Sequence, residues 1–154
     1  MGIKEKAVRN FTEKGYNCCQ AVICAYCEEH GIADDDIFKA TEGFGAGMGG
    51  LLNTCGAVTG MYMAIGIQNS AGEKDNPRKT KMDTYASIRD VAQKFEDENG
   101  SIFCRDLKAI ENGVQRVSCQ KCVEDAAEPG KLEVGGASRD STGLGALEEG
   151  LISS

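Results

Sequence analysis

The stretch Asn17-Cys-Cys-Gln-Ala-Val-Ile-Cys-Ala-Tyr-Cys-Glu-Glu-His-Gly31 contains a helix whose two ends are both marked in the sequence. Asparagine is a preferred residue immediately before a helix, because its side chain accepts a hydrogen bond from a free amide of the first turn. Glycine often follows the last helical residue. We therefore expect a helix that begins after Asn17, runs to about His30 and is ended by Gly31.

Helices are predicted on both sides of this stretch. Between Thr80 and Glu98, apolar residues recur at steps of three and four residues, which is typical of an amphipathic helix. Further helices are expected over residues 3–14, 37–42, 55–67, 101–110 and 119–128. No alternating strand pattern and no internal repeat is found. The sequence therefore predicts an all-α fold, a compact bundle of about five to seven helices with a glycine-rich loop (43–50) before the central helix.

The composition changes near the end of the chain. Residues 130–154 hold six glycines and four serines, with only scattered apolar residues. We expect two parts in this chain of 154 residues: a cysteine-rich helical domain at 1–128 and a flexible Gly/Ser-rich tail at 129–154.

Charge and hydropathy exclude several function classes. The net charge is −7, from 17 basic and 24 acidic residues, and there is no basic block, so we expect no binding to nucleic acid. The uncharged stretch 43–72 is interrupted by glycine and polar residues, so we do not expect a membrane span. Residues 1–11 are charged and lack an apolar segment, so we expect no secretory signal and a cytoplasmic protein.

The chain has eight cysteines and one histidine. In a reducing compartment, cysteines are more often metal ligands or working thiols than disulfides. Four of them follow candidate helix caps, where free amides and the helix dipole lower the pKa of a thiol. Four such thiolates could meet at one point: Cys18 after Asn17, Cys55 after Thr54, Cys104 three residues after Ser101, and Cys119 after Ser118.

The other four cysteines are interpreted differently. Free cysteine often behaves as a small buried hydrophobic residue, which is our expectation for Cys19, Cys24 and Cys27, with Cys19 at the rim of its helix. For Cys122 both interpretations stay open, because Cys119-x-x-Cys122 has the spacing of redox and metal sites.

Three motifs have less specific explanations. Gly45-Ala-Gly-Met-Gly-Gly50 satisfies G-x-G-x-x-G but follows no strand, so we reject a dinucleotide site. Gly56-x-x-x-Gly60 indicates that another helix or a bound group lies close to this face. Cys24-x-x-Cys27 is followed by glutamate, which does not indicate covalent haem, and the single His30 gives no histidine-rich zinc site.

Five segments occur in an order that resembles a known family. They are Gly15-Tyr-Asn-Cys-Cys-Gln-Ala-Val22, Gly43-Phe-Gly-Ala-Gly-Met48, Cys55-Gly-Ala-Val-Thr-Gly60, Gly100-Ser-Ile-Phe-Cys-Arg-Asp-Leu107 and Cys119-Gln-Lys-Cys-Val123. Together they resemble the redox-active proteins named for their C-GCAxxG-C-C cysteine pattern, over about residues 3–128.

The resemblance implies a small, mostly helical redox protein. The four cysteines of the pattern match Cys18, Cys55, Cys104 and Cys119, and relatives within larger electron-transfer proteins imply an iron–sulfur centre. This chain reads Cys-Gly-Ala where the name has Gly-Cys-Ala, and it adds Cys19, Cys24, Cys27 and Cys122.

Three hypotheses follow. In the first, the four cysteines of the pattern bind an iron–sulfur cluster, and this cluster exchanges electrons with a redox partner protein. In the second, the same thiols form a metal-free thiol–disulfide oxidoreductase. In the third, four cysteines hold a structural zinc, or the chain is a metal-free interaction module. Whether the protein is an enzyme, and whether it forms a homo-oligomer, is left open.

Overall fold

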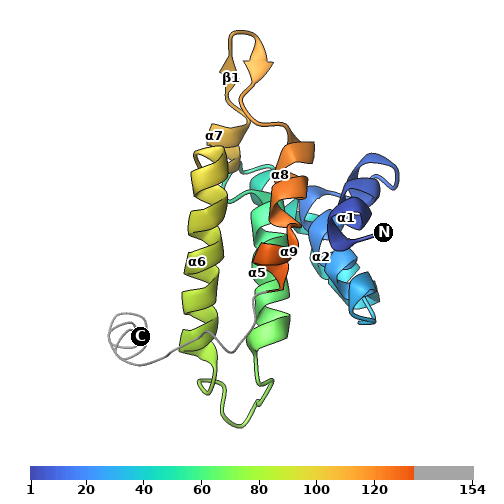
Figure 1. Cartoon of the computed structure of the whole chain (residues 1–154), viewed down its shortest axis with the longest axis vertical. Coiled ribbons are helices and arrows are strands. Elements are labelled where there is room, and N and C mark those ends of the chain that lie inside the picture. The colour runs from blue at the N-terminus through green and yellow to red at the C-terminus, as the bar shows by residue number, and fades with distance from the viewer. Residues whose placement is uncertain (134–154) are drawn as a thin grey trace.

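A computed structural model describes residues 1–133 and shows a mostly helical protein (Figure 1). These residues contain nine α-helices, one 3-10 turn and one short hairpin: α1 (Ile3–Thr12), α2 (Cys18–Glu29), α3 (Asp35–Ala40), η1 (Glu42–Phe44), α4 (Gly45–Met48), α5 (Gly56–Asn69), α6 (Lys81–Asn99), α7 (Cys104–Leu107), β1 (Ile110–Glu111), β2 (Val114–Gln115), α8 (Cys119–Ala126) and α9 (Pro129–Leu132).

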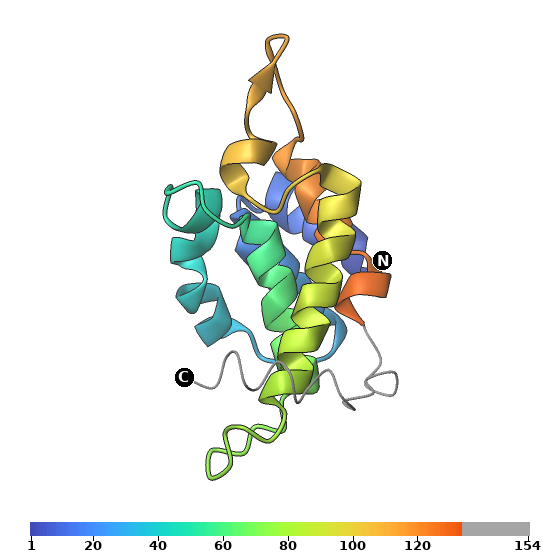
Figure 2. The same cartoon turned by 90° about the vertical axis from the view of Figure 1, so that its left-hand side faces the viewer.

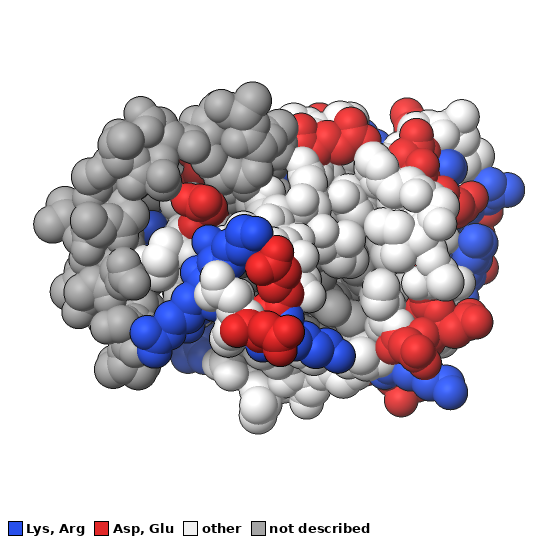
Figure 3. Space-filling view, turned by 90° about the horizontal axis from the view of Figure 1, so that it is seen from below, with Lys and Arg blue, Asp and Glu red and all other residues white. Residues whose placement is uncertain are grey.

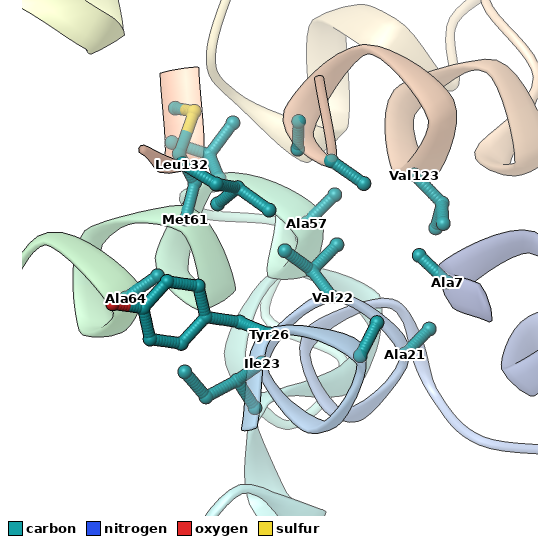
Figure 4. Close-up of a cluster of buried hydrophobic side chains, with 14 of the residues drawn as sticks. Ala7, Ala21, Val22, Ile23, Tyr26, Ala57, Met61, Ala64, Val123 and Leu132 are labelled. Carbon is teal, nitrogen blue, oxygen red and sulfur yellow. The ribbon is translucent and has the colours of Figure 1, made fainter. Parts of the chain in front are cut away.

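Helices α2 and α5 form the centre of the fold. Helix α1 packs on α2, α6 packs on α5, and α8 contacts α1, α2 and α5. Figures 1 and 2 show α5 and α6 side by side, with α8 alongside α5. Figure 4 shows how α1, α2, α5, α8 and α9 contribute side chains to one core, among them Ala7, Val22, Met61, Val123 and Leu132, none of which is exposed to solvent.

The glycines of α5 allow α2 to approach closely. A Cβ atom placed on Gly60 would lie 2.9 Å from the carbonyl oxygen of Cys19 and 3.1 Å from Cβ of Val22. A Cβ on Gly56 would lie 2.9 Å from the carbonyl oxygen of Phe44. The expectation that another helix lies close to the Gly56-x-x-x-Gly60 face is confirmed.

The helix signals at both ends of α2 are confirmed. The Asn17 side chain accepts a hydrogen bond from the amide of Gln20 (2.9 Å), and the Gln20 side chain accepts one from the amide of Asn17 (3.0 Å). Gly31 follows the helix with φ +65°, a left-handed conformation that suits glycine. At α8, Ser118 accepts a hydrogen bond from the amide of Lys121 (3.0 Å), as its position in the sequence predicts.

The prediction of an all-α fold of five to seven helices is wrong in two details. The described residues contain nine α-helices, three of which are single turns of four residues, and they also contain an antiparallel hairpin in which Ile110 pairs with Gln115. Asn112 and Gly113 connect its strands with φ +54° and +78°. Asn-Gly favours this tight hairpin turn, and apolar Ile110 and Val114 flank it, so the sequence contained a signal that we did not use.

The last described helix lies in residues that the sequence assigned to the tail. Leu132 of α9 is fully buried, and Lys131 forms an ion pair with Glu98 at 2.8 Å. The body of the fold therefore extends beyond residue 128. The rest of the predicted tail, 134–154, lies outside the described residues.

The surface and the helix lengths bear on possible partners. Within residues 1–133, no helix is long and apolar enough to cross a membrane. On the face shown in Figure 3, basic and acidic side chains lie next to one another around an uncharged area.

The close packing of α2 on α5 can be tested with two glycine substitutions in one helix. Gly60→Ala places a methyl group against rigid backbone, and we expect it to lower the free energy of unfolding by about 1–3 kcal/mol. In Gly66→Ala the new methyl group has no atom within 4 Å. Alanine there should raise the free energy by about 0.5–1 kcal/mol. Urea unfolding of both variants measures the difference, and equal midpoints would contradict the close approach.

Candidate functional site

Five cysteines line one pocket at the end of the molecule where α7, the hairpin and the first turn of α8 meet (Figure 1). Its volume is about 20 Å³, which is room for about one water molecule. The pocket contains every cysteine that the sequence selected and one that it left undecided. We call it the cysteine pocket; its cysteines are Cys18, Cys55, Cys104, Cys119 and Cys122.

The four selected cysteines stand at helix starts, as expected. Cys18, Cys104 and Cys119 are the first residues of α2, α7 and α8. The sequence predicted a helix that begins at Cys55, whereas α5 begins at Gly56 and Cys55 is the residue before it.

The cap predicted for Cys104 is wrong. Helix α7 starts at Cys104, with Phe103 before it and no side-chain cap. The Ser101 hydroxyl instead accepts a hydrogen bond from the amide of Phe103 (2.9 Å) and donates one to the Asp106 carboxylate (2.7 Å). Ser101 therefore shapes the turn before α7 without capping the helix.

Backbone hydrogen bonds hold Cys55 and Cys104 side by side. The amide of Cys55 donates to the carbonyl of Ile102 (2.8 Å), and the amide of Cys104 donates to the carbonyl of Asn53 (2.6 Å). The guanidinium of Arg105 donates to Asn53 Oδ1 at 2.7 Å. Two segments about 50 residues apart in the chain are thus joined at the pocket.

The glycine-rich segment forms a left-handed turn over Cys104. Residues 46–50 all have positive φ, including Ala46 (+51°) and Met48 (+70°). Left-handed backbone costs a non-glycine residue about 1–2 kcal/mol. A Cβ on Gly47 would lie only 2.7 Å from Cβ of Cys104, so this turn contacts the pocket through a bare backbone. Such strain is typical of functional sites.

Four thiols form two hydrogen-bonded pairs. The thiol of Cys18 donates to the sulfur of Cys119, and the thiol of Cys122 donates to the sulfur of Cys55. Each pair therefore consists of one protonated donor and one sulfur acceptor. We call Cys18 and Cys119 the outer pair, because both are half-buried, and Cys55 and Cys122 the inner pair, because both are buried.

The outer pair holds its negative charge on Cys119. The hydrogen bond from Cys18 lowers the pKa of Cys119 to about 6, and the charge of Lys108 and a hydrogen bond from Gln115 act in the same direction against burial. The pKa of Cys18 is raised, because it donates to Cys119 and is itself buried beside other sulfurs. At neutral pH this pair is a thiol next to a thiolate.

The inner pair has the same arrangement. The hydrogen bond from Cys122 lowers the pKa of Cys55, with support from the amides of Ala57 and Val58 in the first turn of α5. The pKa of Cys122 is raised by its hydrogen bond to Cys55 and by burial. Sequence reasoning left Cys122 undecided, and the Cys119-x-x-Cys122 spacing was the signal for it.

The expectation that all four helix starts favour thiolates is wrong for Cys18 and Cys104. Cys104 makes no hydrogen bond to another thiol of the described residues, and burial raises its pKa. For Cys18, the hydrogen bond that it donates to Cys119 is the largest influence on its pKa, which is raised in spite of the position at a helix start.

The three cysteines expected to be structural lie in the core. Cys19 and Cys27 are fully buried and Cys24 nearly so. Burial raises the pKa of Cys19, Cys24 and Cys27 to about 11, 12 and 11. The helical spacing had suggested that Cys19 lies at the rim of its helix, which is wrong. Its sulfur lies 4.0 Å from the sulfur of Met63.

The fit of the pocket to a metal centre is partial. Four cysteine thiolates are the usual ligands of iron–sulfur clusters and of structural zinc. Within residues 1–133, however, no group of three or more His, Cys, Asp or Glu side chains is arranged to hold a metal ion. The donor chemistry fits, and the arrangement of the thiols in pairs does not.

Comparisons with known proteins agree with the cysteine pattern. A family model described as "Putative redox-active protein (C_GCAxxG_C_C)" matches residues 16–130. An uncharacterized protein of Archaeoglobus fulgidus is 29% identical over 136 residues, with 80% of this chain and 90% of that protein covered. No solved structure matches the chain.

The charge on Cys119 can be tested by its alkylation rate as a function of pH. Only the thiolate reacts, so the rate for the reduced protein should rise with pH and reach half its maximum near pH 6. Cys18→Ala removes the donor and should move this midpoint towards about 8.5, the ordinary value of cysteine. Cys18→Ser keeps a hydroxyl donor and is the matched control, with a midpoint below that of Cys18→Ala. Iodoacetamide labelling followed by peptide mass spectrometry measures Cys119 alone, and a wild-type midpoint near 8.5 would contradict the hydrogen bond.

Proposed function

The chain belongs to the family described as "Putative redox-active protein (C_GCAxxG_C_C)", and from this premise we propose that it is a thiol–disulfide redox protein whose working groups are Cys18 and Cys119. The observation that supports this most directly is that Cys18 and Cys119 line the same pocket of about 20 Å³, where the Cys18 thiol lowers the pKa of Cys119. Two sulfurs in so small a space, one of them a thiolate at neutral pH, are the groups from which a disulfide forms.

The reaction needs a disulfide in an oxidised partner protein. The Cys119 thiolate attacks one sulfur of that disulfide, and the other partner sulfur leaves as a thiolate. Cys18 then loses its proton and attacks the Cys119 sulfur of the mixed disulfide. The products are a Cys18–Cys119 disulfide and a reduced partner with one thiol, which has taken up the proton of Cys18, and one thiolate. The reverse sequence oxidises a reduced partner.

Two charged or polar side chains assist Cys119. The ammonium of Lys108 favours the thiolate, and Gln115 Nε2 lies 3.9 Å from its sulfur. Both act before the attack and again when Cys119 leaves as a thiolate in the reverse reaction. A lower pKa makes Cys119 the better leaving group of the outer pair.

The surface beside the pocket supports a protein as the partner. Among residues 1–133, several large exposed hydrophobic side chains lie in segments next to residues of the pocket: Leu51, Leu52, Phe103, Ile110 and Val114. Exposed apolar side chains that gather in one region are typical of a contact surface. A cytoplasmic location suits this function, because reducing conditions return the cysteines to thiols.

A second candidate function is electron transfer by an iron–sulfur cluster. The observation in its favour is the fifth sulfur: Cys104 lines the same pocket but belongs to neither pair. In this function Cys18, Cys55, Cys104 and Cys119 would hold the cluster, which would supply one-electron chemistry. Both thiol pairs would have to separate, so we place this function second.

Oxidation of the reduced protein tests the first function. Glutathione disulfide should produce a Cys18–Cys119 disulfide and lower the thiol titre, because Cys119 is a thiolate beside a second sulfur. Cys119→Ser should abolish this disulfide, whereas Cys27→Ala, in the core, should leave it. An unchanged thiol titre in the wild type would rule the function out.

Metal analysis separates the two functions. We expect protein purified without oxygen to be colourless and to contain neither iron nor sulfide, even after reconstitution. Cys104→Ser is the discriminating variant, because it should leave thiol exchange intact and would remove a cluster ligand. Absorbance that dithionite bleaches, with stoichiometric iron and sulfide and lost in Cys104→Ser, would replace the first function by the second. A colourless protein with bound zinc and no oxidisable pair would indicate a structural zinc site.

A further inference from the structure

The inner pair cannot meet a partner protein directly. Cys55 is 5% exposed and Cys122 is 3% exposed, whereas both residues of the outer pair are half-buried. The inner pair nevertheless has the same thiol-and-acceptor arrangement as the outer pair and lines the same pocket. A structural role for two buried thiols would not require this arrangement.

We propose that Cys55 and Cys122 are a second redox pair that receives the disulfide from Cys18 and Cys119 inside the protein. This inference rests on the proposed thiol–disulfide function. It adds an internal acceptor, so that one chain stores two disulfides, and it gives Cys122 a catalytic role.

The packing of α2 on α5 brings the two pairs together. A Cβ placed on Gly56, the residue after Cys55, would lie 3.2 Å from Cβ of Cys18 and 3.1 Å from the amide nitrogen of Cys19. The start of α2 therefore lies against the start of α5, where the chain enters the helix after Cys55. Cys119 and Cys122 are one helical turn apart in α8, so each pair has one member on this helix.

The first step is an attack on the Cys18 side of the outer disulfide. The thiolate of Cys55 attacks the Cys18 sulfur, the Cys18–Cys119 bond breaks, and a Cys18–Cys55 disulfide forms. Cys119 leaves as a thiolate, which Lys108 stabilises. Attack on Cys18 is favoured over attack on Cys119, because the sulfur with the lower pKa leaves faster.

The second step completes the transfer. Cys122 loses its proton and attacks the Cys55 sulfur, so that a Cys55–Cys122 disulfide forms and Cys18 leaves. Cys18 takes up the proton that Cys122 lost, which restores the hydrogen-bonded thiol and thiolate of the outer pair. No electron enters or leaves, and the outer pair is ready to accept a second disulfide from the partner.

A pulse experiment on the full-length protein follows the disulfide in time. Reduced, metal-free protein receives less than one equivalent of glutathione disulfide, and samples are quenched with acid, alkylated and mapped by mass spectrometry. We expect Cys18–Cys119 to appear first and then to be replaced by Cys55–Cys122, with no change in total thiol during the second phase. With excess oxidant, the wild type should form both disulfides and so lose twice as many thiols as a protein in which only the outer pair is oxidised.

Two serine variants sharpen the test. Cys122→Ser should stop the sequence before the inner disulfide, halve the thiols lost with excess oxidant, and accumulate Cys18–Cys119 or Cys18–Cys55. Cys27→Ser is the control, since it makes the same change at a core cysteine outside the pocket and should leave the transfer unchanged. Circular dichroism establishes whether both variants are folded. If Cys122→Ser does not fold, the time course of the wild type alone tests the internal transfer.

The outcomes separate this inference from the function on which it rests. An outer disulfide that forms and stays, with Cys55 and Cys122 remaining thiols, would overturn the internal transfer and keep the proposed function. Failure of any Cys18–Cys119 disulfide to form would overturn both. An inner disulfide that forms equally fast in Cys18→Ser would also overturn the transfer, because it would show that the inner pair is oxidised without the outer pair.

Discussion

The contact between α2 and α5 is the constraint on which the cysteine pocket depends. Gly56 and Gly60 let the two helices approach until a methyl group on either glycine would touch backbone atoms of the neighbouring segments. Cys18 at the start of one helix and Cys55 before the other are therefore held at the same end of the molecule. The remaining elements, the turn at 46–50, α7 and the first turn of α8, close around this point.

The chemistry of the pocket follows from the cost of placing several negative charges in a small buried space. A helix start favours a thiolate, but like charges close together oppose one another and burial opposes each of them. In this structure the conflict is resolved by pairing, because Cys18 and Cys122 keep their protons and donate hydrogen bonds to Cys119 and Cys55. The same argument explains why a centre of four thiolates needs a cation, and why the paired arrangement suits thiol exchange without one.

The sequence predicted the helical body and four of the five pocket cysteines, because caps and helical spacing are local signals. Asn17, Ser118 and the terminal glycines act as their positions suggest. The hairpin was missed because Asn112-Gly113 lies between strands of only two residues, too short for an alternating pattern. The pairing of Cys55 with Cys122 depends on how α5 and α8 pack, and no spacing within one segment contains that information.

The two cysteine pairs of the pocket differ in burial. The outer pair is reachable from the surface, the inner pair is not, and the strained turn at 46–50 contacts the pocket through the backbone of Gly47. A pocket that served only to hold sulfur away from solvent would not need one half-buried thiolate, and a pocket that served only a partner would not need two buried thiols. The combination is what a protein requires if it accepts oxidising equivalents at its surface and keeps them in its interior.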